Sequence, residues 1–272
     1  MSTTTEFWDV NGTSLSTLAW NIDTLNGRQR VPMLRGEDTK VPFRPGAIWR
    51  PKQPDSRTLT LAMWVLGCNT DGSAPVGMNA RSKFNDNREA LIKLFFSPDT
   101  QLNLTKRWLS SGAIKSATAL AELVSDMDAT MLGIDGAQFV VDLRLADPYF
   151  YGASTTPAAL AVGVGAAVVN PGMAAVQKMT IVFNGALTNP RLTNSTTGVW
   201  VQYTGVIAGG ASVTLNTDLF TAVTSASTNV IGSITHQGAR NWLPLRVGSN
   251  TLTLTASAGT GTATITFQPP YI

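Results

Sequence analysis

The chain contains one cysteine, Cys68, and one histidine, His236, among its 272 residues. A single cysteine cannot form an intramolecular disulfide, which excludes a disulfide-stapled scaffold. A single imidazole leaves no second histidine for a metal site of the usual kind. His236 lies in the sequence Ile-Thr-His-Gln-Gly, and no Gly-x-Ser-x-Gly elbow occurs in the chain. We therefore expect no catalytic residues and no enzyme activity.

Charged residues are also scarce, at 14% of the chain, which excludes a coiled coil and a disordered charged tail. The net charge is +3, yet residues 1–152 carry 16 Lys and Arg against 16 Asp and Glu. Scattered positions rather than a basic patch account for the excess, which argues against specific nucleic-acid binding. The charged residues of the second half are Lys178, Arg191, Arg240, Arg246 and Asp218.

No long hydrophobic run is present. The longest apolar stretch, residues 157–169, is interrupted by glycine and is shorter than the roughly 20 residues of a membrane helix. Residues 1–6 are polar and lack the basic and apolar regions of a signal peptide. We expect a soluble protein, made in a cytoplasm and not inserted into a membrane.

The chain is rich in turn-forming residues, with 24 Gly and 14 Pro, and in Thr, Ser, Asn and Ala. This mixture is typical of many short strands joined by tight turns. Charge is evenly spread before Gly152, whereas the sequence after it is rich in Thr, Ala, Val and Gly. The composition predicts two domains, residues 1–152 and 153–272.

In the first half, Asn11-Gly12 and Asn26-Gly27 are the strongest hairpin signals, because both residue types tolerate positive φ. Residues 36–51 are punctuated by proline and cannot form a central strand. Residues 57–67, 102–109 and 138–146 alternate in polarity as strands do. Residues 113–124 fit both a helical stripe and an extended strand.

Residues 80–96 form the one convincing helix. Phe84, Leu91, Leu94 and Phe95 fall on one face at helical spacing, and we expect Asn87 to lie with the polar residues elsewhere. Ser97-Pro98 ends the helix, since a residue before proline avoids helical geometry.

The second half reads as all β, and short strands at regular spacing predict a β-sandwich. Residues 153–171 read as a linker that passes into a first strand. Further strands are expected at 179–183, 190–194, 198–206, 212–216, 243–245, 251–256 and 262–267.

Two apparent binding motifs fail on inspection. A calcium loop starting at Asp126 needs glycine at its sixth position and glutamate at its twelfth, where the chain has Met131 and Ala137. Gly163-Val-Gly165 lacks the third glycine of a dinucleotide loop. We expect no metal site and no cofactor, and we assign the seven tryptophans to core or interface packing.

Several features stand in a definite order along the chain. The first half has the Asn11-Gly12 turn, the stretch Gly27…Pro32…Arg35-Gly36…Pro42…Arg44-Pro45-Gly46, the strand and helix described above, and Asp147-Pro148-Tyr149-Phe150-Tyr151. The second half has Asn189-Pro-Arg-Leu-Thr-Asn194, Tyr203…Gly205…Gly209-Gly210…Val213-Thr-Leu-Asn-Thr-Asp218, and Trp242-Leu-Pro-Leu-Arg-Val-Gly248-Ser-Asn250. As an ordered set, they resemble the distal tail protein family of long-tailed, siphophage-type bacteriophages over nearly the whole chain.

The resemblance implies a mainly β protein. Its N-terminal domain would be a β-sandwich of the tail-tube-like kind with one α-helix, and its C-terminal domain a galectin-like β-sandwich. The implied role is that of a structural virion protein at the distal end of the phage tail. Six N-terminal domains would form a homohexameric ring around the channel that DNA crosses. Tail tube protein would lie above the ring, tail tip or baseplate hub proteins below it, and the C-terminal domain would serve as an attachment point.

Other functions stay open at this point. A tail tube protein or another minor tail protein would have a related fold, and a tail-associated hydrolase would need a metal-free carboxylate mechanism. A carbohydrate-binding module of the tail tip is a further alternative, although no sugar-binding motif maps onto this chain.

Overall fold

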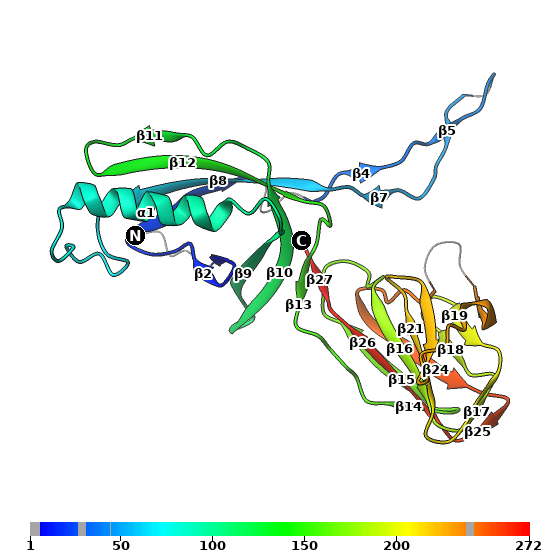
Figure 1. Cartoon of the computed structure of the whole chain (residues 1–272). Helices are drawn as coiled ribbons and strands as arrows, with labels where there is room; N and C mark the ends of the chain where they lie inside the picture. The colour runs from blue at the N-terminus through cyan, green and yellow to red at the C-terminus, as the bar shows by residue number, and fades with distance from the viewer. Residues whose placement is uncertain (1–5, 27–30, 44, 238–241) are drawn as a thin grey trace. The chain divides into compact units, whose positions relative to one another are not determined.

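The computed structural model describes residues 6–26, 31–43, 45–237 and 242–272. The chain divides into two compact units, Met1–Phe150 together with Ile272, and Tyr151–Tyr271 (Figure 1). We call them the N-terminal unit and the C-terminal unit. The composition places the boundary two residues later, after residue 152. Gly27, and with it the predicted Asn26-Gly27 turn, lies outside the described residues.

The N-terminal unit is built on an antiparallel sheet with the strand order β2-β1-β9-β10-β12-β8-β3, and β11 pairs with β12. The predicted mainly β character is therefore confirmed. The elements of this unit are β1 (Glu6–Val10), β2 (Thr13–Ser14), β3 (Trp20–Asn26), β4 (Leu34–Arg35), β5 (Thr39–Lys40), β6 (Ala47–Ile48), β7 (Gln53–Pro54), β8 (Arg57–Leu66), α1 (Ala80–Phe95), β9 (Leu102–Ser110), β10 (Ala113–Leu123), β11 (Ala129–Met131) and β12 (Gly136–Leu145), and β13 (Phe150–Gly152) spans the division.

The Asn11-Gly12 turn is confirmed between β1 and β2. Asn11 and Gly12 have φ of 49° and 80°, the left-handed pair that a two-residue hairpin turn requires. The Asn11 side-chain oxygen accepts a hydrogen bond from the backbone N–H of Asn103 at 2.9 Å, which ties the turn to β9.

Strand β8 carries the core of the N-terminal unit, as the alternation of residues 57–67 predicts. Leu59, Leu61, Met63 and Val65 are fully buried, while the residues between them lie on the other face. The ambiguous residues 113–124 form strand β10, because Ala117, Ala119 and Ala121 alternate inward. Ala117, Leu120, Ala121 and Val124 also fall at helical spacing, which is why periodicity alone does not decide.

The predicted helix is confirmed as α1. The Asn79 side chain caps its first turn by accepting a hydrogen bond from Ser82 N at 2.8 Å. Phe84, Leu91 and Phe95 are buried, whereas Leu94 is only partly buried.

Asn87 lies on the buried face of α1, and the expectation that it faces away from the core is wrong. Its amide Nδ2 donates hydrogen bonds to the carbonyl oxygens of Leu66 and Cys68, at 2.8 and 2.9 Å. Leu66 is the last residue of β8, and Cys68 follows two residues later. Asn87 is thus buried because it satisfies backbone groups that would otherwise be desolvated without a partner.

The C-terminal unit contains two five-stranded sheets, ordered β14-β26-β16-β21-β22 and β15-β24-β18-β19-β23, and a three-stranded sheet, β20-β17-β25. Its elements are β14 (Leu160–Ala161), β15 (Gly165–Asn170), β16 (Met179–Asn184), β17 (Leu187–Thr188), β18 (Arg191–Asn194), β19 (Val199–Tyr203), β20 (Val206–Ile207), β21 (Ser212–Asn216), β22 (Thr221–Thr224), the 3-10 helix η1 (Ile231–Ser233), β23 (Ile234–His236), β24 (Gly248–Thr255), β25 (Ala258–Gly259), β26 (Thr262–Phe267) and β27 (Pro270–Tyr271).

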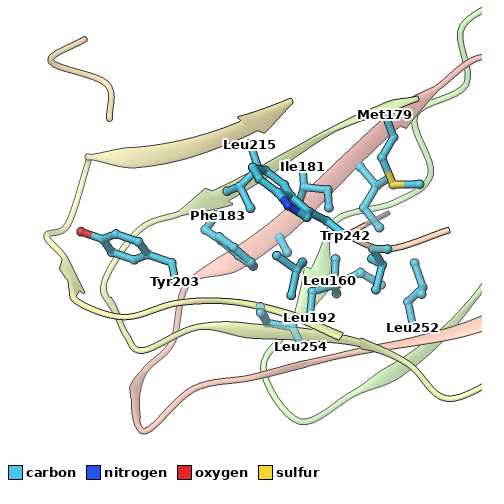
Figure 2. Packing of buried hydrophobic residues seen from close by; sticks show 14 of the residues in the cluster. Leu160, Met179, Ile181, Phe183, Leu192, Tyr203, Leu215, Trp242, Leu252 and Leu254 are labelled. Carbon is cyan, nitrogen blue, oxygen red and sulfur yellow. The ribbon is translucent and has the colours of Figure 1, made fainter. Parts of the chain in front are cut away.

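The core of the C-terminal unit lies between the two five-stranded sheets (Figure 2). Ile181, Phe183 and Leu215 come from one sheet, and Leu192 and Leu254 from the other. Burying each such side chain contributes about 1.5–3 kcal/mol. This inward alternation on both sheets is that of a β-sandwich.

Three expectations for the second half need correction. Residues 153–171 do pass into a strand, the six-residue β15, whose valines pair along β24, but they also contain the short strand β14 and are more than a linker before it. Residues 198–206 form two strands, since the chain turns at Gly205, where φ is 155° and a Cβ would lie 2.7 Å from the Tyr203 hydroxyl. Residues 243–245 form no strand; Pro244 has no N–H, and only Leu245 pairs, with Val176.

A buried pair of asparagines locks two segments that the sequence presents as separate motifs. Asn194 Nδ2 donates to Asn250 Oδ1 at 3.1 Å and to Pro244 O at 3.0 Å. Asn250 Nδ2 donates in turn to Arg246 O at 2.8 Å and to Gly248 O at 3.1 Å, and its Oδ1 accepts from Arg246 N at 2.9 Å. Both side chains are fully buried, so the turn before β24 depends on them.

We expect Asn87→Ala to lower the free energy of unfolding of the N-terminal unit by about 1–3 kcal/mol, because it leaves the carbonyls of Leu66 and Cys68 without this donor. Chemical denaturation followed by helical circular dichroism measures this, since α1 is the α-helix of the described residues. Asn85→Ala, at an exposed position of the same helix, is the control. Equal stability of the two variants would contradict the anchoring role.

We expect Asn250→Ala to destabilise the C-terminal unit by about 3 kcal/mol, since it removes the donor to two carbonyls and the acceptor of two N–H groups. Ser249→Ala, at the exposed neighbouring position, should change stability by less than about 0.5 kcal/mol. Thermal unfolding by calorimetry compares the two. An equal loss of stability in both variants would mean that any substitution in this turn destabilises the unit, whether or not it removes the asparagine amide.

Candidate assembly surfaces

A two-stranded arm runs out from the β3–β8 hairpin of the N-terminal unit (Figure 1). It comprises the described residues between 31 and 56. Strand β4 pairs with β7, and β5 pairs with β6 farther out. The proline-punctuated stretch is thus no central strand, as predicted. A lone two-stranded ladder has little stability of its own in water, so the arm needs a partner surface to become firmly ordered.

Polar side chains hold the arm's two chains together. Asp38 Oδ1 accepts from Arg50 N at 3.2 Å, and Lys52 Nζ lies 3.5 Å from Asp38 Oδ2. Arg50 Nε donates to Thr39 Oγ1 at 2.5 Å. These charged groups are at least partly exposed, and each such pair contributes little to the free energy of unfolding. Their main effect is to align the two chains of the arm.

Large apolar side chains project from the arm into solvent. Phe43 has an exposed fraction of 109% and φ of 59°, an unusual backbone conformation for a bulky residue. Met33 and Trp49 are exposed by 81% and 70%, and Val31, Leu34 and Ile48 are also exposed. Large exposed apolar side chains gathered on one segment are typical of an interaction surface.

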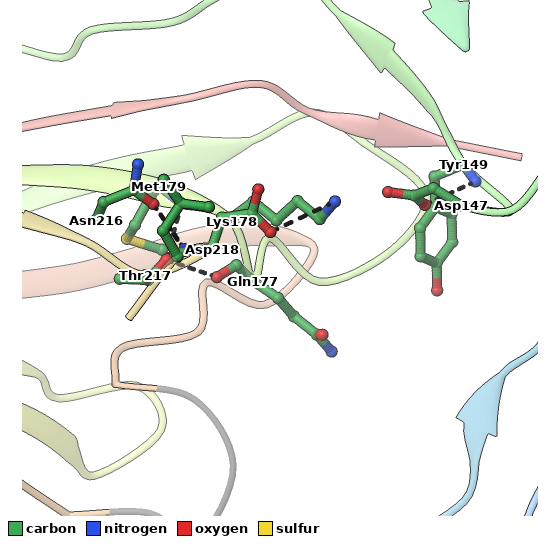
Figure 3. A network of polar contacts seen from close by, with 9 residues as sticks. Asp147, Tyr149, Gln177, Lys178, Met179, Asn216, Thr217 and Asp218 are labelled. Carbon is green, nitrogen blue, oxygen red and sulfur yellow. Dashed lines mark hydrogen bonds and ion pairs between the residues drawn. The ribbon is translucent and has the colours of Figure 1, made fainter. Parts of the chain in front are cut away.

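The Asp147-Pro-Tyr-Phe-Tyr151 motif closes the N-terminal unit. Phe150 is buried edge-on against Trp8, with ring centroids 5.7 Å apart, and the Arg57 guanidinium lies 5.3 Å from its centroid. Asp147 Oδ1 accepts a hydrogen bond from Tyr149 N at 3.3 Å (Figure 3). Partial burial and the Asp147 charge raise the pKa of Tyr149. The motif's part in this unit is packing.

In the C-terminal unit, a polar network joins β16 to the end of β21 (Figure 3). Thr217 Oγ1 donates to Gln177 O at 2.7 Å and accepts from Met179 N at 2.9 Å. Lys178 Nζ lies 3.5 Å from Asp218 Oδ1. Asp218 is the only acidic residue after residue 152, so this ion pair uses the single carboxylate side chain of the second half.

The residues weighed as catalytic or metal-binding candidates lie on separate elements of the structure. His236 is exposed on β23, with its ring centroid 6.3 Å from that of Trp242. The Cys68 thiol donates to Leu18 O at 3.0 Å. Asp126 and Asp128 are exposed, and Asp128 caps the backbone N–H of Ala129. Gly163, with φ of 80°, forms the turn between β14 and β15.

Over the described ranges, no three His, Cys, Asp or Glu side chains gather in a way that could hold a metal ion. No helix in the described part of the chain has the length and apolar character that crossing a membrane requires.

The tryptophans take different roles, which the sequence does not distinguish. Trp8 and Trp242 are core residues, as the default assignment holds. Trp49 is exposed on the arm. Trp200 lies on an outer sheet face beneath the guanidinium of Arg191, whose Cζ is 4.0 Å from the ring centroid.

Comparison with known proteins gives a family match for part of the chain and a fold match over nearly all of it. Residues 172–271 match the model of the siphovirus-type tail component, C-terminal domain, of the SPP1 Dit family. No curated protein matches the chain by sequence. Among solved structures, the Dit protein of phage SPP1 matches with a TM-score of 0.68 and 16% identity, over 98% of this chain and 99% of that one. That protein is described as a paradigm of the hub adsorption apparatus in phages that infect Gram-positive bacteria.

Weaker likenesses are to the phage P2 baseplate in its activated conformation. The calcium form has a TM-score of 0.43 and 7% identity, over 97% of both chains. The strontium form has a TM-score of 0.42 and 7% identity, over 96% of this chain and 97% of that one. The resemblance to the distal tail protein family is confirmed by the family match within the C-terminal unit and by the SPP1 Dit fold match across both units.

We expect Phe43→Ser and Trp49→Ser together to change the free energy of unfolding by less than about 1 kcal/mol, because neither side chain contributes to the core. Leu61→Ala, fully buried on β8, should cost about 2–5 kcal/mol. Urea denaturation of dilute protein measures both. An arm variant as unstable as Leu61→Ala would show that the arm packs against the body of its own chain.

Proposed function

We propose that this protein is a structural component of the distal end of a long-tailed phage tail, acting as the hub that joins the tail tube to the tail tip or baseplate. The observation that carries the proposal is the fold match to SPP1 Dit across both units, together with the family match of residues 172–271. The role is structural rather than enzymatic, in keeping with these relatives.

In this proposal the N-terminal unit forms the ring. Six copies close head to tail, so each contributes two different surfaces to its neighbours. The arm is one of them: Phe43 and Trp49 become buried against the next copy, which orders a ladder that is marginal by itself. The charges of residues 1–152 balance, with 16 of each sign, which suits a ring that surrounds DNA without binding it specifically.

The C-terminal unit serves as an attachment module on the outside of the ring. Support comes from the family match, which lies within this unit. Its self-contained β-sandwich core allows it to fold without depending on the ring. A galectin-like sandwich in this position would present sheet faces and loops to tip or baseplate proteins.

The mass of the purified protein tests the ring. Six times 28.8 kDa is about 173 kDa, and we expect light scattering to give that mass and negative-stain images to show a six-fold annulus. The Phe43→Ser/Trp49→Ser variant should stay monomeric. The control is Val206→Ser/Leu219→Ser, which removes apolar side chains of similar exposure, 72% and 68%, from the C-terminal unit and should still assemble.

Other results point to the other functions. Long filaments would indicate a tail tube protein. A wild-type protein that remains at 28.8 kDa at every concentration would contradict a self-assembling ring and favour a binding module, which a glycan screen then tests. If the Phe43→Ser/Trp49→Ser variant forms rings as well as the wild-type protein does, the arm is not part of the interface between copies.

A further inference from the structure

Arg191 occupies an unusual position on the outer face of the sheet β15-β24-β18-β19-β23. It begins β18, directly opposite Gln202 on β19 and Thr255 on β24. Its side chain reaches the diagonal neighbour Trp200 and stacks on the indole, with Cζ only 4.0 Å from the ring centroid. Stacking at this distance fixes the plane of the guanidinium before any partner arrives.

The Arg191 charge is not compensated within the described part of the chain. No ion pair or side-chain hydrogen bond of its guanidinium is found there, and its Nε is buried without a hydrogen-bond partner. Residues 153–272 contain four basic residues and one acid, Asp218, which lies 3.5 Å from Lys178. The C-terminal half therefore has no second carboxylate side chain to offer Arg191.

The residues that neighbour Arg191 on this sheet face include polar side chains. On the same face, the registers β18–β19 and β18–β24 set Thr193 opposite both Trp200 and Thr253. Hydroxyl and amide groups of these residues and of Gln202 can complete hydrogen bonds around a bound anion. A planar guanidinium binds a carboxylate through two parallel N–H bonds, and Arg and Trp are the residues most enriched at energetic centres of protein interfaces.

We propose that this face, centred on Arg191 and Trp200, binds a glutamate- or aspartate-bearing segment of a partner protein. The inference rests on the proposed role of the C-terminal unit as an attachment module, and it adds the chemistry of the partner. Charge complementarity selects an acidic partner. The Trp200 ring face on which a sugar would stack is already covered by the guanidinium, so the occupant is a peptide carboxylate rather than a glycan.

A capped hexaglutamate peptide titrated into the full-length chain at low salt tests the proposal, with the indole N–H of Trp200 followed by NMR. We expect saturable binding that moves this signal, and no binding of hexaglutamine. Arg191→Gln should weaken binding about tenfold or more, since it removes a charge-assisted bidentate contact. Arg191→Lys keeps the charge but loses the fork, so it should weaken binding severalfold.

Arg246→Gln is the matched control, because it removes one positive charge from an exposed side chain of the same unit. It should change the affinity less than about twofold, because the Arg246 guanidinium is not part of the Arg191–Trp200 stack. An equal loss of hexaglutamate affinity in Arg191→Gln and Arg246→Gln would mean that only the net charge of the protein matters, and it would overturn the proposal. So would the absence of hexaglutamate binding, or tighter binding of an oligogalacturonate than of the peptide.

The mass of each variant separates this proposal from that of the ring. Arg191→Gln should keep the mass of the wild-type protein, since Arg191 lies outside the N-terminal unit. If the wild-type chain binds hexaglutamate through Arg191 but forms no ring, the acidic-partner site is supported and the proposed ring is contradicted. A loss of mass in Arg191→Gln and Arg191→Lys would make the face a contact between copies, which contradicts a separate acidic partner.

Discussion

The antiparallel register between β8 and β12 is the constraint on which the N-terminal unit depends. It sets Leu59 opposite Leu143, Leu61 opposite Val141, and Met63 opposite Phe139, so that buried residues face buried residues at every second of the ten pairs. A slip of one residue would turn this whole apolar set to the outer face. Helix α1 packs against the face so formed, and the amide of Asn87 fastens the helix to the end of β8. The arm also originates here, because it is the connection between β3 and β8.

In the C-terminal unit the comparable constraint is polar. The two sheets supply an apolar core, yet the turn that leads into β24 is fixed by the amides of Asn194 and Asn250. Buried amides of this kind stabilise only when every donor and acceptor is used, and here their partners are mostly backbone carbonyls. The position of β24 between β15 and β18 depends on that turn, and so does the flat outer face that carries Arg191.

Residue patterns predict those elements whose cause is local. The Asn11-Gly12 turn, the alternation of β8 and the apolar face of α1 each follow from neighbouring residues alone. The patterns fail where a distant group decides. Asn87 is buried because it donates hydrogen bonds to carbonyl oxygens at the end of β8, and Gly165–Asn170 forms a strand because β24 lies beside it. The arm's exposed side chains and the stacked Arg191 could not be predicted either, since exposure and stacking depend on what the rest of the fold leaves uncovered.

The two candidate surfaces differ in chemistry, and the difference follows from the composition of the two halves. The first half has balanced charges, so an arm rich in Phe, Trp and Met can associate with a like copy without electrostatic repulsion. The second half has almost no acid, so a copy of this unit cannot satisfy the Arg191 of another. An apolar surface suits a permanent contact between identical subunits, whereas an uncompensated, preorganised cation selects a different partner. In the proposed assembly, the contact between copies and the contact with an acidic partner therefore use chemically different surfaces of one chain.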